Sequence, residues 1–197
     1  EGMAYLSSGV WIDIYQASDN GAGGLRSAKG ATPLTSKTWY EFVEMALAVG
    51  KRLPSYAEWL EAAVGSPGGN DGDNTNAWTK TTNTASNPTG GVDRAVSSVG
   101  CRDCVGNIYE WTNELITRAE HAVGGEHTST AWGWDNSSPL GAGYGNIYQY
   151  YRYSLVALMA GGSWEHGVDA GARCVHVNSY LWRVQTIIGA RAACDSL

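Results

Sequence analysis

Four cysteines are the most reactive side chains in this sequence. Cys101 and Cys104 form a C-x-x-C pair, while Cys174 and Cys194 stand toward the end of the chain. A C-x-x-C pair is typical of redox chemistry in a βαβ setting, and it supplies half of a tetrahedral zinc site. The βαβ setting is missing, and a zinc site would need Cys174 and Cys194 to come close to the first pair in space.

The two terminal cysteines allow two structural interpretations. Both fall in segments that we expect to be adjacent strands, where they pack as small apolar side chains or form a cross-strand disulfide. A disulfide would close a loop of about 20 residues and stabilise the fold by roughly 3 kcal/mol. No Ser-His-Asp or Cys-His arrangement can be assembled, and no metal-ligand spacing occurs among His121, His127, His166 and His176.

The segment 161–197, GGSWEHGVDAGARCVHVNSYLWRVQTIIGARAACDSL, combines a regular framework with chemically unrelated side chains. Glycines, Trp164 and small apolar residues recur through it, and acidic, basic, aromatic and amide side chains stand between them. A rigid frame lets exposed side chains change at small cost in folding free energy.

The composition indicates what kind of fold positions these residues. A chain of 197 residues with 43% hydrophobic content is long enough for one buried core, so we expect a single domain over residues 1–197. Its 26 Gly, 9 Trp and 11 Tyr indicate a loop-rich fold. The net charge of -6, the lack of a long apolar run and the start of the chain predict no nucleic-acid partner, no membrane insertion and no signal peptide.

Two capping boxes predict two short helices. Thr38 and Glu41 precede the segment WYEFVEMALAVG, and Ser55 and Glu58 precede YAEWLEAAVG. The glycines at the ends of these segments are expected to stop both helices. Their buried faces are expected to consist of Phe42, Met45, Ala46, Trp59, Leu60, Ala63 and Val64.

The other segments predict few strands and long loops. A Gly/Ser/Ala-rich loop should follow the first strand, and irregular excursions should span 65–91, where Trp78 anchors the loop, and 118–153. The expected strands cover residues 9–14, 107–112, 155–160, 173–177 and 189–194.

Three segments, GKRLPSYAEWLEAA, GCRDCVGNIYEWT and GGSW...GARC...IGARAACD, together resemble the variant C-type lectin fold. Formylglycine-generating enzymes and the variable proteins of diversity-generating retroelements share this fold. The resemblance extends from about Gly50 to the C-terminus. It implies an α+β C-type lectin fold of the formylglycine-generating-enzyme-like type, with two short helices, few short antiparallel strands and long ordered loops.

Two of these motifs carry charged residues that could do chemistry. Arg52 and Glu58 beside Trp59 are typical of an ion pair next to a core ring, and acid/base catalysis is the alternative. In formylglycine-generating enzymes the second motif supplies calcium ligands, so the resemblance implies a structural calcium site at Asp103, the backbone carbonyls of Gly106 and Ile108, and Glu110. The alternative is that Glu110 only accepts hydrogen bonds from loop amides. No cofactor is expected to be required.

The C-terminal segment resembles the variable region of the retroelement proteins, in which a template is mutated at its adenines. This places a variable region at about 161–191. The fixed positions of that region match Gly161, Gly162, Trp164, Gly167, Ala170, Gly171, Ile188, Gly189 and Arg191. The changeable positions match Glu165, His166, Val168, Asp169, His176, Asn178, Ser179, Tyr180, Arg183, Gln185 and Ile187.

Three residues depart from the pattern of mutated Asn codons. Such codons keep a pyrimidine in third place, so they cannot produce Glu, Gln or Trp. Glu165 and Gln185 therefore come from another template codon or are fixed, and Trp182 is expected to be a fixed member of the binding face. The tyrosine-rich segment 148–153 either extends this face or packs against the terminal strands. The main contacts and charges are expected from His176, Tyr180, Trp182, Arg183, Glu165 and Asp169.

The resemblance implies a ligand-binding protein without catalysis, which displays a diversified surface to an unknown protein or cell-surface ligand from a virion or a cell. Two alternatives stay open. A formylglycine-generating-enzyme-like oxidase would need a reactive cysteine pair that binds copper, and the cysteine context of that enzyme is missing. A non-diversified adhesin or lectin module is the other alternative, although the motifs of calcium-dependent sugar binding are reduced to SNPTG and WDN in the wrong order.

Overall fold

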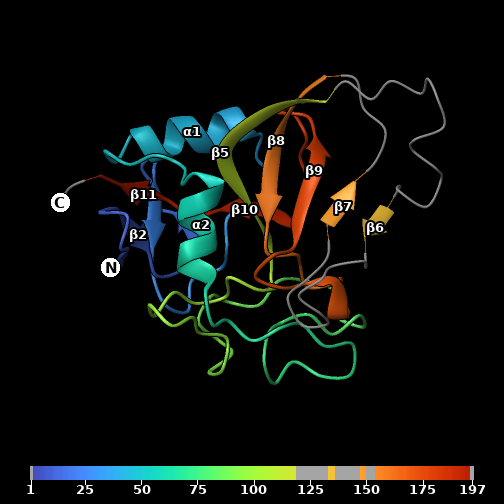
Figure 1. The fold of residues 1–197 in the computed structure, drawn as a ribbon. Helices are drawn as coiled ribbons and strands as arrows, with labels where there is room; N and C mark the ends of the chain where they lie inside the picture. Colours follow the sequence, from blue (N-terminus) through green and yellow to red (C-terminus); the bar gives the residue numbers. More distant parts are fainter. Residues whose placement is uncertain (1, 119–132, 136–146, 150–153, 196–197) are drawn as a thin grey trace.

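The computed structural model describes residues 2–118, 133–135, 147–149 and 154–195, whose strands form three sheets around two α-helices (Figure 1). The largest sheet has six strands in the order β10-β5-β8-β9-β7-β6. Its strands are β5 (Tyr109–Arg118), β6 (Gly133–Asp135), β7 (Ile147–Gln149), β8 (Ser154–Ala160), β9 (Val175–Ser179) and β10 (Ile188–Ala190).

This sheet is mixed rather than antiparallel throughout. β5 pairs antiparallel with β8, and β8 pairs antiparallel with β9, but β10–β5 and β7–β9 are parallel pairs. The prediction of antiparallel strands alone was therefore incomplete. Parallel pairing joins strands that are far apart along the chain, and local sequence alternation carries no signal for it.

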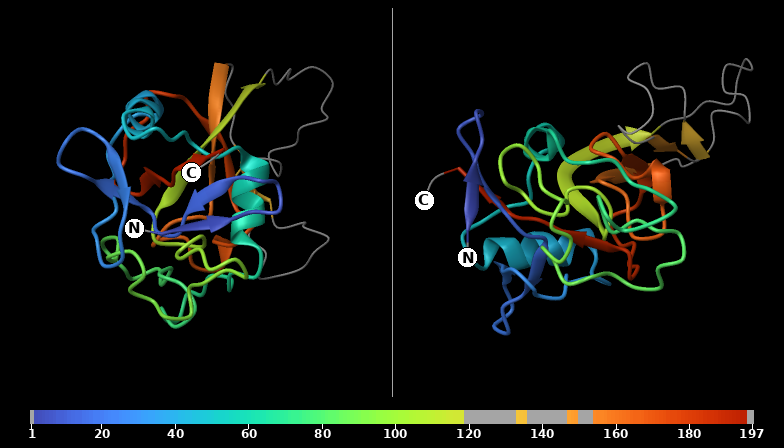
Figure 2. Two further views of the ribbon diagram at one scale, coloured as in Figure 1. Left: turned by 90° about the vertical axis from the view of Figure 1, so that its left-hand side faces the viewer. Right: turned by 90° about the horizontal axis from the view of Figure 1, so that it is seen from below.

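The first and last strands of the described chain belong to a second sheet, in which both pair with the same middle strand. β1 (Met3–Tyr5), β2 (Trp11–Asp13) and β11 (Ala193–Cys194) form it, with β2 in the middle, and Figure 2 shows the two ends of the chain close together. The strand predicted at 189–194 is thus two strands in two sheets, β10 and β11. The chain leaves one sheet and enters the other at Arg191, whose side chain is completely buried.

One predicted loop contains a hairpin. β3 (Ala17–Asp19) and β4 (Leu25–Ser27) pair antiparallel within the Gly/Ser/Ala-rich segment after the first strand. The Asn20 side chain closes the turn, because its Oδ1 accepts hydrogen bonds from the amides of Ala22 and Gly24 at 2.7 and 3.0 Å. The turn residues were visible in the sequence, but the short flanking strands were not.

Both predicted helices and both capping boxes are confirmed: α1 is Trp39–Leu47 and α2 is Tyr56–Ala63. Phe42, Ala46, Trp59 and Ala63 are buried as expected. Val64 was assigned to the buried face wrongly, because α2 ends at Ala63 and the extended backbone of Val64 leaves its side chain 56% exposed.

Side-chain alternation along β5 separates two parts of the interior. Tyr109 and Trp111 face an apolar cluster that includes Trp39 and Phe42, whereas Glu110 points to the other side, where its carboxylate meets Trp59. The loops between residues 65 and 105, green in Figures 1 and 2, gather at one end of the molecule next to the short 3-10 helix Gly167–Asp169. A hydrogen bond from the Gly167 amide to the Thr79 carbonyl joins the two.

Candidate ligand-binding site

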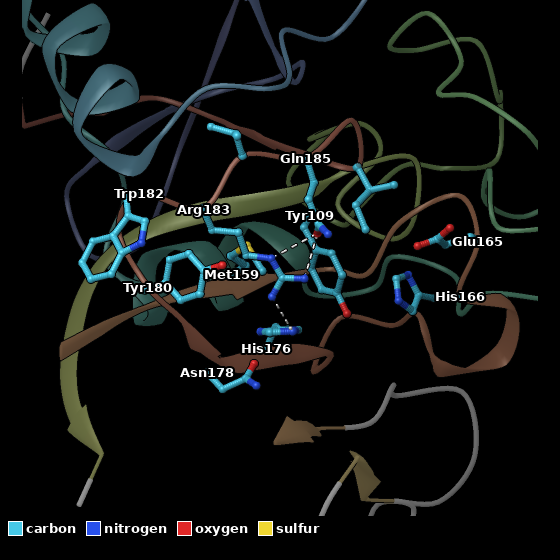
Figure 3. A pocket seen from close by; sticks show the side chains of 12 residues that line it. Tyr109, Met159, Glu165, His166, His176, Asn178, Tyr180, Trp182, Arg183 and Gln185 are labelled. Carbon is cyan, nitrogen blue, oxygen red and sulfur yellow. Dashed lines mark hydrogen bonds between the residues drawn. The ribbon is translucent and has the colours of Figure 1, made fainter. Parts of the chain in front are cut away.

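A cavity of about 580 Å³ lies beside β9 and the loop that follows it (Figure 3). We call it the binding cavity. Most of its lining comes from the predicted changeable positions, together with Trp182: Glu165, His166, His176, Asn178, Tyr180, Trp182, Arg183, Gln185 and Ile187. The sequence did not predict the other lining residues, which are Tyr109, Met159 and Val184.

Tyr109 lies between two imidazole rings at the base of the cavity. Its ring centroid is 5.0 Å from that of His166 and 5.8 Å from that of His176, both in edge-on arrangements. The phenol oxygen lies 3.8 Å from Cys174 Sγ, and burial raises the pKa of Tyr109 well above its usual value, so the phenol is protonated. Strand alternation in the NIYEW motif was the signal that could have identified this residue.

The tautomer of His166 follows from its neighbour Ser163. The Ser163 amide donates to His166 Nδ1 at 3.2 Å, so a neutral ring carries its proton on Nε2. Burial lowers the pKa of His166 to about 4. At neutral pH the ring is therefore an uncharged hydrogen-bonding group of the cavity.

His176 forms a hydrogen-bonded group with Ser179 and Arg183. Arg183 Nη1 lies 3.4 Å from His176 Nε2, and since a guanidinium only donates, this nitrogen accepts and Nδ1 donates to Ser179 Oγ at 3.0 Å. Burial and the positive charge of Arg183 lower the pKa of His176. Further bonds from Arg183 to Ser179 Oγ at 3.1 Å and to Gln185 Oε1 at 2.8 Å hold the guanidinium in place.

The rim of the binding cavity carries an aromatic pair. The rings of Tyr180 and Trp182 are stacked with centroids 5.0 Å apart and an interplanar angle of 29°, and Trp182 is 62% exposed. Below them, Asn178 is only 4% exposed. Its Oδ1 has no hydrogen-bond partner among the residues that the structure describes.

Three predicted surface positions do not line the cavity. Val168 and Asp169 lie in the 3-10 helix, where Val168 is exposed, but neither contributes to the cavity wall. Ser179 is completely buried and does not line the cavity. Its hydroxyl supports His176 and Arg183 instead. The tyrosine-rich prediction falls partly on residues 150–153, which lie outside the described residues, as do His121 and His127.

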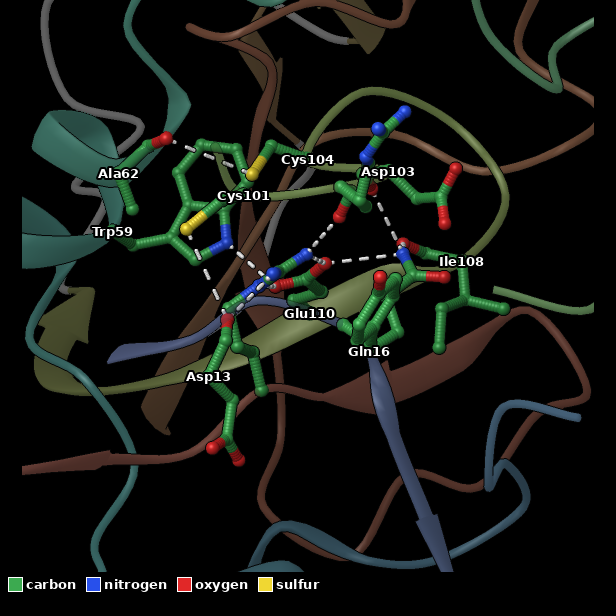
Figure 4. Close-up of polar contacts among 12 residues, drawn as sticks. Asp13, Gln16, Trp59, Ala62, Cys101, Asp103, Cys104, Ile108 and Glu110 are labelled. Atoms are coloured by element: carbon green, nitrogen blue, oxygen red, sulfur yellow. Dashed lines mark hydrogen bonds and ion pairs between the residues drawn. The ribbon is translucent and has the colours of Figure 1, made fainter. Parts of the chain in front are cut away.

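A separate group of polar side chains lies on the other face of β5 (Figure 4). The buried ion pair of Arg191 and Glu110 is bidentate, with Nε–Oε2 2.9 Å and Nη2–Oε1 3.0 Å. Trp59 Nε1 donates to Glu110 Oε2 at 2.8 Å, and Gln16 Nε2 donates to Oε1 at 3.0 Å. We call these four side chains the buried network. Arg191 also donates to the backbone carbonyls of Asp13, Ile14 and Arg102.

This network bears on the calcium site that the resemblance implies. Gln16 Nε2 also donates to the backbone carbonyls of Asp103 at 3.0 Å and Ile108 at 3.4 Å, so an amide nitrogen stands where two of the expected ligand groups, the Ile108 carbonyl and the Glu110 carboxylate, converge. The Asp103 carboxylate accepts from Thr89 and from the Gly90 amide. A divalent cation at this point would lie beside the Arg191 guanidinium and compete with it for Glu110. The described residues do not fit calcium, and Gln16 was missed because it is distant in sequence.

The cysteines are not arranged as a pair in the C-terminal region. Cys174 precedes β9, and Cys194 lies in β11 of another sheet, so the prediction of adjacent strands was wrong, and neither forms a disulfide. Both are buried, Cys174 in the apolar cluster of Trp39 and Phe42, which confirms the interpretation of these two residues as small buried side chains. Cys101 and Cys104 are buried as well. Within the described part of the chain, no group of three or more His, Cys, Asp or Glu residues could hold a metal ion.

The first motif forms the ion pair that the sequence predicted. Arg52 Nη1 and Nη2 contact the Glu58 carboxylate at 2.7 and 2.8 Å, and Asp195 adds a further contact to the guanidinium. Arg52 and Ala193 exchange backbone hydrogen bonds, so the pair ties the start of α2 to the last strand. Its position away from the binding cavity favours the structural interpretation.

Residues 10–195 match the sulfatase-modifying factor enzyme 1-like domain. The chain belongs to this family. The chain is also 26% identical to the tail fiber receptor-binding protein of Bordetella phage BPP-1, a relative matched over all of this chain and 52% of that protein. Another is the serine/threonine-protein kinase Pkn1 of Chlamydia trachomatis, 33% identical over 73% of this chain and 21% of the kinase. The chain thus spans about half of one relative and a fifth of the other.

The fold of this chain, a sulfatase-modifying factor enzyme 1-like domain, is similar to that of a solved structure. The Major Tropism Determinant M1 variant is 24% identical, with a TM-score of 0.62 over 99% of this chain and 52% of that one. The prediction of the variant C-type lectin fold, and of a resemblance to variable proteins, is confirmed. None of the helices in the described ranges has the length and apolar character needed to cross a membrane.

Proposed function

We propose that this chain is a ligand-binding variable protein of a diversity-generating retroelement, and that the binding cavity is its recognition site. The observation that carries the proposal is the convergence of most of the predicted changeable positions on one cavity. They come from β9, from the loop after β9 and from the segment before the 3-10 helix, yet their side chains line a common space.

The fixed positions support the same division of roles. A Cβ atom at Gly162 would lie 2.7 Å from Ala170 Cβ, and one at Gly161 would lie 2.5 Å from the Cys104 carbonyl oxygen. Both glycines have positive φ, which other residues rarely adopt. Substitution there would disturb the frame, whereas Glu165, Val168 and Gln185, which match changeable positions, have exposed side chains.

The similarity to a phage tail fiber receptor-binding protein supports a cell-surface receptor as the target and a virion as the location. A non-enzymatic role is supported by the placement of the cysteines, because Cys174 and Cys194 belong to different parts of the fold and cannot act as one copper-binding pair without rearrangement. The alternative, a formylglycine-generating-enzyme-like oxidase, is favoured only by the family match.

The experiment that tests the proposal examines the source genome. We expect a near-copy of the codons for residues 161–197 that differs mainly at template adenines, next to a reverse-transcriptase gene. A genome without such a copy would contradict diversification. The oxidase alternative predicts copper-dependent oxygen consumption with a cysteine-containing peptide, and loss of that activity in Cys174→Ser.

A further inference from the structure

We propose that the binding cavity takes an uncharged sugar ring of a cell-surface glycan, with one face of the ring on the Tyr180–Trp182 stack and a hydroxyl group donating to Asn178. This inference rests on the proposed binding function and names the chemistry of its ligand. Three observations carry it: the aromatic pair, the buried acceptor and the charge balance of the cavity.

The aromatic pair offers a flat apolar surface at the rim. Its two rings are nearly parallel, and the outer one, Trp182, is largely exposed to solvent. Exposed aromatic rings of this kind provide large contact area at low conformational cost. A pyranose ring presents axial C–H groups on one face, so it can lie flat on such a surface while its hydroxyl groups point sideways and down.

The buried acceptor Asn178 Oδ1 indicates which ligand group would bind at the bottom of the cavity. Asn178 lines the cavity from β9, and Figure 3 shows its side-chain oxygen on the side of His176. This Oδ1 is buried and has no donor among the described residues. A buried acceptor without a partner costs free energy, and a ligand that brings a hydroxyl or N–H donor recovers it.

The charges of the cavity balance. One cation, Arg183, and one anion, Glu165, face a lining of neutral imidazole, phenol and amide groups. The guanidinium is already bound to His176, Ser179 and Gln185. An uncharged ligand with many groups that both donate and accept matches this lining better than a polyanion or polycation does. A protein epitope would enter such a cavity mainly through one side chain, which carries fewer donor and acceptor groups than a sugar ring does.

A glycan array tests the inference with the full chain as the probe. We expect binding to a subset of neutral oligosaccharides, and a solution titration with the best of them should give at least a tenfold weaker Kd for Trp182→Ala and for Asn178→Leu. Tyr5→Ala removes an exposed aromatic ring on β1, a strand of another sheet that does not line the cavity, and should bind as the wild type does. Circular dichroism melting identifies any variant that is not folded, and Asn178→Asp then serves as the second test of the acceptor.

Several results would overturn the sugar assignment. One is binding confined to acidic glycans, another is a Trp182→Ala affinity equal to that of the wild type, and a third is a target on cells that survives periodate but not protease. The last result identifies a protein ligand and leaves the proposed binding function intact. Failure of the proposed binding function would give a different result: the genome would lack the template repeat, and the protein would have oxidase activity.

Discussion

The binding cavity and the buried network lie on opposite faces of the same strand, and adjacent residues serve them. Tyr109 of β5 forms the base of the cavity, and Glu110 is the centre of the network. In the network, both oxygens of Glu110 and every N–H group of the Arg191 guanidinium are hydrogen-bonded within the protein. In the cavity, Asn178 keeps a buried oxygen without a described partner.

This difference shows how a fold can tolerate change in one place. The network joins the first strand region, α2, the loop before β5 and the last strand, so substituting one member leaves charges or carbonyl groups without partners. In the cavity, His176 and Asn178 are almost completely buried, but the side chains of Glu165, Trp182 and Gln185 are exposed to solvent. Their replacement alters what is bound more than whether the chain folds.

The strongest way to test this contrast is to remove the guanidinium of Arg191. Arg191→Met leaves Glu110 as an uncompensated buried charge, and we expect the free energy of unfolding to fall by about 3–5 kcal/mol. Urea denaturation measures it, and Arg183→Met in the cavity is the matched control, with an expected loss below about 1 kcal/mol. Equal losses in the two variants would contradict the contrast. If Arg191→Met does not fold, Glu110→Gln should show a smaller loss of the same origin.

A second prediction concerns acid. Burial lowers the pKa of His166 to about 4, below the unfolded value of about 6.5. Between these values only the unfolded chain binds the proton, so stability falls as the pH decreases through this window, by about 2 kcal/mol from this residue at pH 4.5. Denaturation of the wild type and of His166→Gln at pH 7 and 4.5 measures the difference. A variant as acid-sensitive as the wild type would rule out His166 as the cause.

Gln16 gives a third and smaller effect within the network. Gln16→Ala removes the donor to Glu110 and to the carbonyls of Asp103 and Ile108, and we expect a loss of about 1–2 kcal/mol in unfolding free energy. Because this amide stands among the groups that would ligate calcium, added calcium or a chelator should leave the wild-type melting temperature unchanged. A clear rise in melting temperature with calcium would show that an ion displaces Gln16.

The sequence predicted local features of this molecule well. The capping boxes at Thr38 and Ser55 place both helices correctly, because such a motif involves residues three positions apart. Most lining residues of the cavity were also predicted, because residues 161–191 resemble the variable region of the retroelement proteins and these residues lie within that one segment.

Long-range features were not predictable in this way. Gln16 contacts residues about 90 positions away, and no local pattern indicates that its amide fills the calcium position. Tyr109 and Met159 reach the cavity from strands outside the C-terminal segment. Ser179 belongs to that segment, but its burial depends on Arg183 and His176 folding over it. The division of 189–194 into two strands likewise depends on the buried position of Arg191.

The smallest expected effect separates two positions that the sequence treated alike. Val168 is exposed and lies outside the cavity wall, so Val168→Ala should change stability by less than about 0.5 kcal/mol and leave ligand affinity unchanged. Ser179→Ala removes a buried hydroxyl that holds His176 and Arg183, and it should cost about 1 kcal/mol and weaken binding. Denaturation and titration of both variants check this. A larger loss of affinity in Val168→Ala would mean that the recognition surface extends over the 3-10 helix, beyond the cavity.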